Sequence, residues 1–263
     1  MTLAVAATAR FGADVLERLA DRHELAYCLT RVDSPQGRGR RIAASPAKAV
    51  ASRLGIRVRQ PERLDDSFEL GVDTIVVAAY GLLIPSGLLE RALWLNVHPS
   101  LLPRWRGAAP VERAIMAGDR ETGVTIHRTT PELDAGPIAA QRAFPVAPDD
   151  DAGAVYGRCA ELACDLLDEV LPAPAFVPQA EEGATYAEKL TKADRDLDLS
   201  LPPEEVLNRV RALSPHIGAR AVLHGRRVTL WKARIAGGEL EPLEVQPEGR
   251  RRMGYDEFLH GLR

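Results

Sequence analysis

The chain is poor in the residues and motifs that define several common classes of protein. It has three cysteines in 263 residues, Cys28, Cys159 and Cys164. None forms a CxxC pair, and three thiols cannot all pair with one another. We therefore expect buried thiols and a reducing, cytoplasmic compartment. No apolar run approaches the roughly 20 residues that span a bilayer, so no membrane partner is predicted.

Motifs for common cofactors are also missing. Residues 6–12 read AATARFG, where a dinucleotide-binding enzyme would carry GxGxxG, and no GxxxxGK[ST] occurs. The six histidines are scattered, without HExxH or a Cys/His cluster. The sequence therefore predicts neither a nucleotide-phosphate loop nor a metal site.

What is present is an alternation of apolar strand-like runs and amphipathic helical runs, which predicts an α/β fold with a mostly parallel sheet. Strands are expected at residues 2–7, 25–29, 74–79, 94–97, 124–129 and 138–146. Helices are expected at residues 11–20, 46–54, 85–92, 110–117 and 152–171. Residues 31–45, which include a proline and two glycines, are expected to form a loop.

The composition changes in the last third of the chain. Closely spaced prolines mark a linker, at Pro172, Pro174 and Pro178. Beyond them we expect one amphipathic helix at 204–212 and short strands at 221–223, 227–231 and 243–245. The predicted organisation is a domain over residues 1–177, a linker over 178–199 and a small β-rich domain over 200–263.

The net charge of −3 conceals an uneven distribution. Residues 31–63 hold nine basic and two acidic residues, and residues 143–188 hold one basic and ten acidic residues. Residues 189–234 hold ten basic and five acidic residues. Two basic stretches around an acidic one fit a polyanion bound by two surfaces, and they also fit solvated helix faces and loops.

One short pattern points to chemistry. Asn96 and His98 stand two apart at the end of a β-prone run, so both side chains lie on one side of the strand. Pro99 ends regular structure directly afterwards. An amide donor and an imidazole at the carboxyl end of a strand suit carbonyl chemistry. Asp134, on a predicted turn, supplies a carboxylate.

The run LNVHPSLLPRWRGAAP at residues 95–110 resembles the central motif of the folate-dependent formyltransferase family. Within that family it is most similar to the branch whose acceptor is methionyl initiator tRNA. The similarity continues at residues 35–40, 79–81, 118–119, 122–126, 133–136, 185–191 and 243–249. It therefore covers nearly the whole chain.

This resemblance implies a Rossmann-like formyltransferase domain, a small OB-like C-terminal domain that contacts tRNA, and 10-formyltetrahydrofolate as formyl donor. It assigns the catalytic roles to Asn96, His98 and Asp134. The folate-binding residues that it implies are Gly81, Leu82, Leu83, Ile84, Ser100, Leu101, Leu102 and Pro103. The tRNA-binding residues that it implies are Arg38, Arg40, Arg41, Lys189 and Lys192.

Two positions depart from the family pattern. Ala7 stands where the first turn usually has a glycine. Between Ile235 and Leu243 the chain is too short for the further strands of a typical member, so we expect a shortened C-terminal domain.

The implied reaction is attack of the methionyl α-amine on the formyl carbon. Asn96 would donate to the formyl oxygen, and either His98 or Asp134 would move the proton. Residues 105–110 and 37–40 favour the tRNA acceptor over the alternative within the family, an amino-sugar nucleotide. A glycinamide ribonucleotide acceptor is disfavoured, and a non-catalytic tRNA- or folate-binding protein is the alternative outside enzymes. We expect a monomer, and we expect His127 to be structural or to line the cleft.

Overall fold

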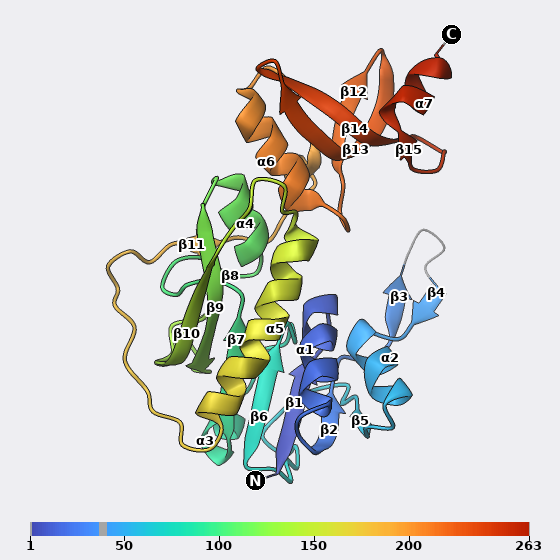
Figure 1. Cartoon of the computed structure of the whole chain (residues 1–263). Helices are drawn as coiled ribbons and strands as arrows, with labels where there is room; N and C mark the ends of the chain where they lie inside the picture. Colours follow the sequence, from blue (N-terminus) through green and yellow to red (C-terminus); the bar gives the residue numbers. More distant parts are fainter. Residues whose placement is uncertain (1, 37–40, 263) are drawn as a thin grey trace. The chain divides into compact units, whose positions relative to one another are not determined.

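A computed structural model of the chain describes residues 2–36 and 41–262 (Figure 1). The chain divides into two compact units. Unit 1 comprises Met1–Arg106, Gly123–Ala143 and Gly157–Thr185, and unit 2 comprises Gly107–Thr122, Phe144–Tyr156 and Tyr186–Arg263. The sequence-based boundaries 1–177, 178–199 and 200–263 stay a prediction.

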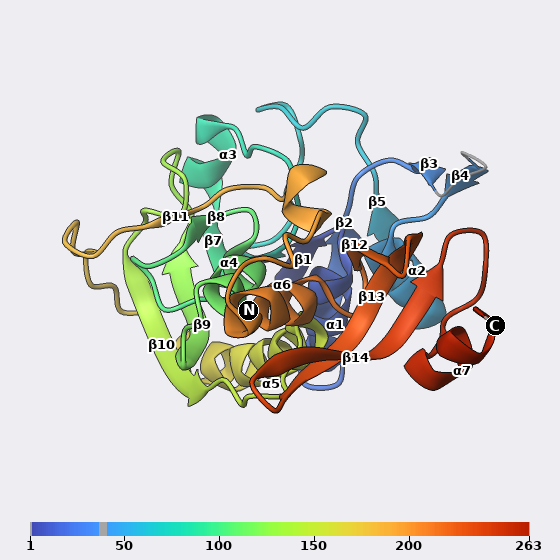
Figure 2. The same cartoon turned by 90° about the horizontal axis from the view of Figure 1, so that it is seen from above.

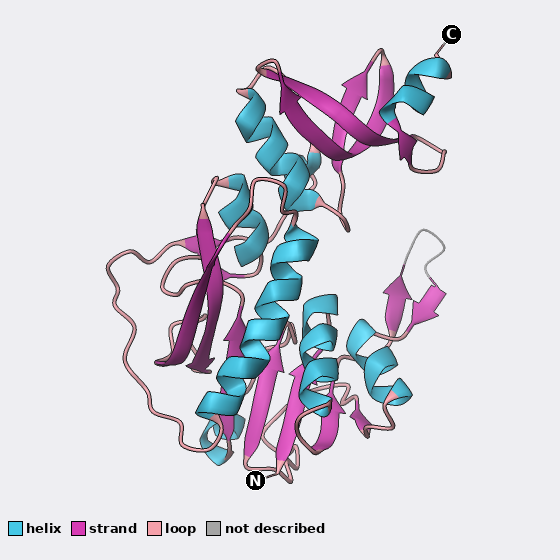
Figure 3. Ribbon diagram, viewed as in Figure 1, coloured by secondary structure: helices cyan, strands magenta, loops and turns pink. Residues whose placement is uncertain are grey.

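Unit 1 is built on a seven-stranded sheet with the order β10-β9-β7-β6-β1-β2-β5 (Figure 3). The strands are β1 Leu3–Ala7, β2 Leu25–Leu29, β5 Val58–Arg59, β6 Thr74–Ala78, β7 Leu93–His98, β9 Glu121–Arg128 and β10 Ile138–Pro145. The pairs β1/β2, β1/β6, β2/β5 and β6/β7 are parallel, and β7/β9 is antiparallel. The prediction of an α/β fold with a mostly parallel sheet is confirmed.

Helices α1 (Arg10–Ala20), α2 (Pro46–Arg53), α3 (Ser86–Arg91) and most of α5 (Ala152–Val170) complete unit 1. The start of α1 lies so close to β6 that a Cβ on Gly12 would overlap the carbonyl oxygen of Ala78. Only glycine fits this approach of helix and strand. Helix α2 begins at its proline because the Ser45 hydroxyl caps it, accepting from the Lys48 N–H at 3.1 Å.

Unit 2 joins α4 (Pro110–Met116) and the first turn of α5 to the C-terminal elements. These are β11 (Tyr186–Ala187), the 3₁₀ helix η1 (Ala193–Arg195), α6 (Pro203–Leu213), β12 (Ala219–Leu223), β13 (Arg226–Ala236), β14 (Glu239–Pro247), β15 (Met253–Gly254) and α7 (Tyr255–His260). Helix α6 packs beside α4 (Figure 2). The strands form an antiparallel sheet in the order β12-β13-β14-β15. The predicted β-rich C-terminal domain is confirmed as an antiparallel β domain.

The stretch between Ile235 and Leu243, where we expect a shortened domain, forms a tight hairpin. Strands β13 and β14 are joined by a two-residue turn, Gly237-Gly238, with φ of 61° and 84°. Two successive residues at positive φ suit a tight hairpin turn, and glycine is the residue that adopts them without strain. Among the described residues the sheet has four strands, with β12 and β15 at its edges.

Several short elements were not predicted. The expected loop at 31–45 is wrong in part, because β3 (Ser34–Gln36) pairs with β4 (Arg41–Ala43). Strand β8 (Arg106–Gly107) pairs with β11. Strands of two or three residues are too short to show a hydrophobic period, and their pairing depends on distant parts of the chain.

The three cysteines are buried thiols, as expected. Burial raises the pKa of Cys28 and of Cys159 to about 12 and that of Cys164 to about 11. Among the helices of the described residues, none has the length and apolar character needed to cross a membrane.

Candidate active site

The carboxyl end of β7 carries two of the three predicted catalytic side chains, and the structure brings the third beside them. Asn96 Nδ2 donates to Asp134 Oδ1 at 3.1 Å. His98 Nδ1 lies 3.6 Å from Asp134 Oδ2. Asn96 and His98 meet the same carboxylate because alternation directs both side chains to one side of β7. Asp134 reaches them from the turn between β9 and β10, and β9 is the strand that pairs with β7.

The surroundings of His98 fix which of its nitrogens is basic. Its Nε2 lies 2.8 Å from the carbonyl oxygen of Trp105. A carbonyl can only accept, so Nε2 carries the hydrogen and Nδ1, which faces Asp134, has the free lone pair. Burial lowers the pKa of His98, although the Asp134 carboxylate and the Trp105 carbonyl oppose that effect. His98 is therefore a neutral base at pH 7.

His127 belongs to the same cluster. The β7/β9 register sets Asn96 opposite His127, and Asn96 Nδ2 lies 2.9 Å from His127 Nε2. The other ring nitrogen, Nδ1, lies 3.1 Å from the Arg128 carbonyl oxygen and donates to it. Nε2 is thus an acceptor that orients the Asn96 amide. Sequence reasoning gave His127 only a structural or cleft-lining part, since its contact depends on the register between two strands.

The turn that carries Asp134 is conformationally specialised. Asp134 has a φ of +48°, in the left-handed region that glycine adopts most easily and aspartate and asparagine more readily than other residues. Two residues on, a Cβ at Gly136 would overlap the Arg128 carbonyl oxygen. An aspartate at the positive φ and a glycine at the close approach therefore both suit the backbone of this turn.

The predicted folate residues fall on two loops at the same edge of the sheet. Gly81, Leu82, Leu83 and Ile84 follow β6, and Leu83 is 91% exposed. Residues 100–103 follow β7, the parallel neighbour of β6. Within that second loop Ser100 is buried, and its hydroxyl donates to the Arg104 carbonyl at 2.7 Å. The Leu102 N–H donates to Thr125 Oγ1 at 3.2 Å. Ser100 and Leu102 therefore also hold the loop together.

The predicted tRNA residues are spread along the chain. Arg38 and Arg40 lie outside the described residues, and Arg41 begins β4. Lys189 and Lys192 are exposed. They lie on either side of residues 190–191, the short segment that leads into η1. Asp194 connects this segment to α4. Its carboxylate lies 2.7 Å from Arg113 Nη1 and accepts from the N–H and hydroxyl of Thr191.

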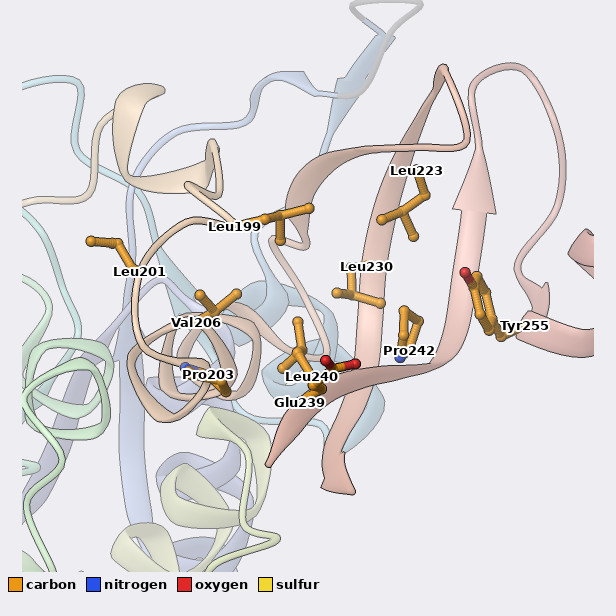
Figure 4. A pocket seen from close by; sticks show the side chains of 10 residues that line it. All are labelled: Leu199, Leu201, Pro203, Val206, Leu223, Leu230, Glu239, Leu240, Pro242 and Tyr255. Carbon is orange, nitrogen blue, oxygen red and sulfur yellow. The ribbon is translucent and has the colours of Figure 1, made fainter. Parts of the chain in front are cut away.

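Unit 2 also contains a pocket of about 400 Å³ (Figure 4). Its walls are mainly leucine, proline and valine side chains, with Glu239 and Tyr255 as the polar members. Most of this lining is apolar, whereas the side chains around β7 combine an amide, two imidazoles and a carboxylate, so the catalytic candidates are those around β7.

The sequence models of a known family match both parts of the chain. The model described as "Formyl transferase" matches residues 1–171, and the one described as "Formyl transferase, C-terminal domain" matches residues 189–239. The chain belongs to this family of formyl-transfer enzymes. The family assignment supports a formyl-transfer enzyme over the non-catalytic alternative that the sequence had left open.

Several similar proteins are methionyl-tRNA formyltransferases. Methionyl-tRNA formyltransferase of Paracoccus denitrificans is 39% identical, with 97% of this chain and 95% of that protein covered. The protein of the same name from Chromobacterium violaceum is 42% identical, over 92% of this chain and 83% of that protein. The alignment with the Dictyoglomus thermophilum protein, at 36% identity, runs over 297 positions, more than the 263 residues of this chain. That relative thus has segments without a counterpart here.

Solved structures share the fold. Methionyl-tRNA formyltransferase from Clostridium thermocellum has a TM-score of 0.70 at 16% identity and covers 94% of this chain and 98% of its own. A sugar 3N-formyl transferase, solved with dTDP and 5-N-formyl-THF, has a TM-score of 0.67 at 13% identity and covers 95% and 99%. At these identities the matches support the fold, and they do not separate the tRNA acceptor from the amino-sugar acceptor.

Proposed function

We propose that the chain transfers the formyl group of 10-formyltetrahydrofolate to the α-amine of methionyl initiator tRNA, as a cytoplasmic monomer. The observation that carries this proposal is the convergence of Asn96, His98 and Asp134 at the carboxyl end of β7. The full-length similarity to proteins named methionyl-tRNA formyltransferase supports the choice of acceptor.

Asn96 is assigned to the formyl oxygen. Its two amide hydrogens now point to Asp134 Oδ1 and His127 Nε2. As the amine attacks, negative charge develops on the formyl oxygen, and an amide donor aimed at that oxygen stabilises it by about 3–4 kcal/mol. The formyl oxygen takes the place of one of the two present acceptors, while the other keeps the amide plane in position.

His98 is assigned to the proton. Its Nδ1 is neutral, buried and directed toward Asp134, so it can accept the proton that the attacking amine loses. Asp134 then faces an imidazolium and stabilises it by charge. The Trp105 carbonyl holds the ring throughout by its bond to Nε2. This arrangement favours His98 over Asp134 as the group that carries the proton to the leaving folate nitrogen.

The surrounding loops are assigned to the two substrates. Leu82 and Leu83 offer exposed apolar side chains beside the carboxyl edge of the sheet, which suits the flat, largely apolar face of a pterin. For tRNA, Lys189 and Lys192 together with the arginines at 38, 40 and 41 offer phosphate contacts. Exposed basic residues of unit 2 add to these, and they include Arg226, Arg227, Lys232 and Arg250.

The decisive test is formyl transfer from 10-formyltetrahydrofolate with three acceptors in parallel. These are methionyl initiator tRNA, methionyl elongator tRNA and an amino-sugar nucleotide. We expect transfer to the initiator tRNA alone. Transfer to the sugar, or to none of the three, would overturn the proposed acceptor.

A further inference from the structure

One further segment of the chain contacts both the turn that carries Asp134 and the loop that follows His98. Residues 172–185, called the strap below, follow α5 and belong to unit 1. The strap bonds to the start of β10 through Val177, whose N–H and carbonyl both pair with Ile138, at 2.9 and 2.8 Å. It bonds to the loop after β7 through Thr185, whose hydroxyl accepts from the Trp105 N–H at 2.9 Å. The strap therefore contacts the Asp134 turn on one side and the His98 loop on the other.

Gln179 is the strap residue with the most specific contacts. Its Nε2 donates to the carbonyl oxygens of Asp134 and Gly136, at 2.8 and 2.6 Å. Its Oε1 accepts from Arg106 Nε at 3.2 Å and from Arg106 Nη2 at 3.0 Å. Both hydrogens and both lone pairs of the amide are thus used. Turning the amide over would set oxygen against two carbonyls and nitrogen against a guanidinium, so one orientation is fixed.

Arg106 connects this amide to His98. Its side chain is 3% exposed, although it carries a permanent charge. The carboxylate of the exposed Glu181 lies 3.5 Å from Nη2. Arg106 also directly follows Trp105, the residue whose carbonyl receives His98 Nε2. A continuous path therefore runs from the Asp134 turn through Gln179 and Arg106 to the carbonyl that orients His98.

We propose that Gln179, held in orientation by Arg106, is a positioning residue for the formyl-transfer step. It keeps the Asp134 turn, and with it the Asp134 carboxylate, in its position relative to His98. It touches neither the donor nor the acceptor, and it acts only through the Asp134 and Gly136 carbonyls. The expected loss of kcat rests on the proposed function. The expected change in the position of Asp134 relative to His98 does not depend on it.

The geometry gives a reason for such a residue. Asp134 sits at a positive φ, which costs some free energy for any residue with a Cβ, so contacts from outside the turn help to keep this conformation. The gap of 3.6 Å between Asp134 Oδ2 and His98 Nδ1 is also wider than a hydrogen bond. The two groups therefore do not hold each other in the resting state. A misplacement of about 1 Å at a reacting group can cost on the order of 100-fold in rate.

The test compares two substitutions of Gln179 with wild type at saturating donor and tRNA. Gln179→Leu removes all four hydrogen bonds. Gln179→Glu keeps oxygens for Arg106, and forms an ion pair with it, but loses both N–H donors to the turn. We expect both variants to lose about 10- to 100-fold in kcat, with KM for each substrate within about twofold. Gln179→Glu also sets a carboxylate oxygen against the Asp134 and Gly136 carbonyls, so it should unfold at a lower temperature than wild type, and kcat is compared well below that temperature.

Gln60→Leu is the matched control. Gln60 also donates from one amide nitrogen to two acceptors, the Arg31 carbonyl at 2.7 Å and Asp33 Oδ1 at 2.9 Å, away from the catalytic side chains. We expect its kcat to match wild type. A purely structural role for Gln179 predicts instead that Gln179→Glu, with its ion pair to Arg106, keeps full kcat, and that result would overturn the proposal.

A second readout needs no substrate. The ring of His98 can be titrated by NMR in the ligand-free protein, where it faces the Asp134 carboxylate, His127 and the Trp105 carbonyl. In Gln179→Leu the carboxylate is no longer held, so the pKa of His98 should fall further, whereas Gln60→Leu should leave it unchanged. An unchanged pKa in Gln179→Leu would overturn the positioning role. If wild type transfers no formyl group to initiator tRNA, the proposed function fails while this titration still decides the positioning.

Discussion

Polar side chains are distributed in opposite ways in the two units. In unit 1 they are buried and paired, as with His98, His127 and Arg106 around the Asp134 turn. In unit 2 the described buried polar side chains are Thr122 and Ser214, while basic side chains are exposed along β13. Group-transfer chemistry needs a few donors in fixed positions in a low dielectric. Binding a polyanion needs many charges in contact with solvent and tolerates their motion. The contrast predicts that mutations in unit 1 change rates and mutations in unit 2 change affinity or stability.

The largest effect is expected for Asn96→Ala in unit 1. Loss of its amide donor should lower kcat by about 100- to 1,000-fold. The affinity for tRNA, measured by filter binding at fixed salt, should stay within about twofold. Asn208→Ala is the control, since Asn208 lies on α6 of unit 2 and accepts from Arg211 Nη1 at 3.0 Å. An unchanged kcat in Asn96→Ala would remove Asn96 from the mechanism.

The next effect concerns the stability of unit 2. Partial burial raises the pKa of Asp194, but the Arg113 guanidinium and the Thr191 N–H and hydroxyl outweigh it and bring that pKa to about 2. Asp194→Asn should therefore lower the free energy of unfolding by about 2 kcal/mol at pH 7. The folded-state pKa lies below the unfolded value of about 3.9, so the stabilisation is complete above pH 4 and is lost as the pH falls toward 2.

Urea unfolding of wild type and Asp194→Asn at pH 7, 5 and 3 measures this difference. The difference in the free energy of unfolding between wild type and Asp194→Asn should be smaller at pH 3 than at pH 7. Asp14→Asn is the control, because its pair with Arg10 on α1 is a solvent-exposed i,i+4 pair and is expected to contribute no more than about 0.5 kcal/mol. If Asp194→Asn and Asp14→Asn lost equal free energies of unfolding, the contacts of Asp194 would not stabilise the protein more than an exposed ion pair does.

A smaller effect is expected for the paired change Lys189→Ala and Lys192→Ala. KM for tRNA should rise several-fold while kcat stays constant. The slope of log affinity against log salt should flatten by about one unit for each lost phosphate contact. A change in kcat alone would show that these lysines act in the reaction and not in tRNA binding. It would also contradict the expectation that mutations in unit 2 change affinity or stability and not rate.

The sequence allowed much of unit 1 to be predicted because the relevant signals are local. Strand β6 is a run of five buried apolar residues, and Ser45 and Pro46 mark the start of α2. Asn96 and His98 could be paired by strand alternation alone. Asp134 was joined to them through the resemblance to the formyltransferase family, since nothing local places a turn residue beside a strand 36 positions earlier.

The contacts that could not be predicted are those that depend on register or on distant chain segments. His127 faces Asn96 only through the β7/β9 register. The Trp105 carbonyl that selects the His98 tautomer is a backbone atom, which carries no side-chain signal. Gln179 lies 45 positions after Asp134, in a stretch whose prolines favoured a linker. These are packing relations, and no periodicity or propensity encodes them.

The burial of all three thiols also makes the protein suitable for fluorescence labelling. Thiolates are the species that react with maleimides, and pKa values of about 11 to 12 leave Cys28, Cys159 and Cys164 protonated as well as inaccessible at pH 7. A single cysteine at Val222, which is 60% exposed on β12, would then take up one dye per chain without prior removal of the native cysteines. Mass spectrometry after maleimide treatment should find no adduct on the native chain and one adduct on Val222→Cys. Such a dye would test whether tRNA reaches unit 2, as the proposed function expects.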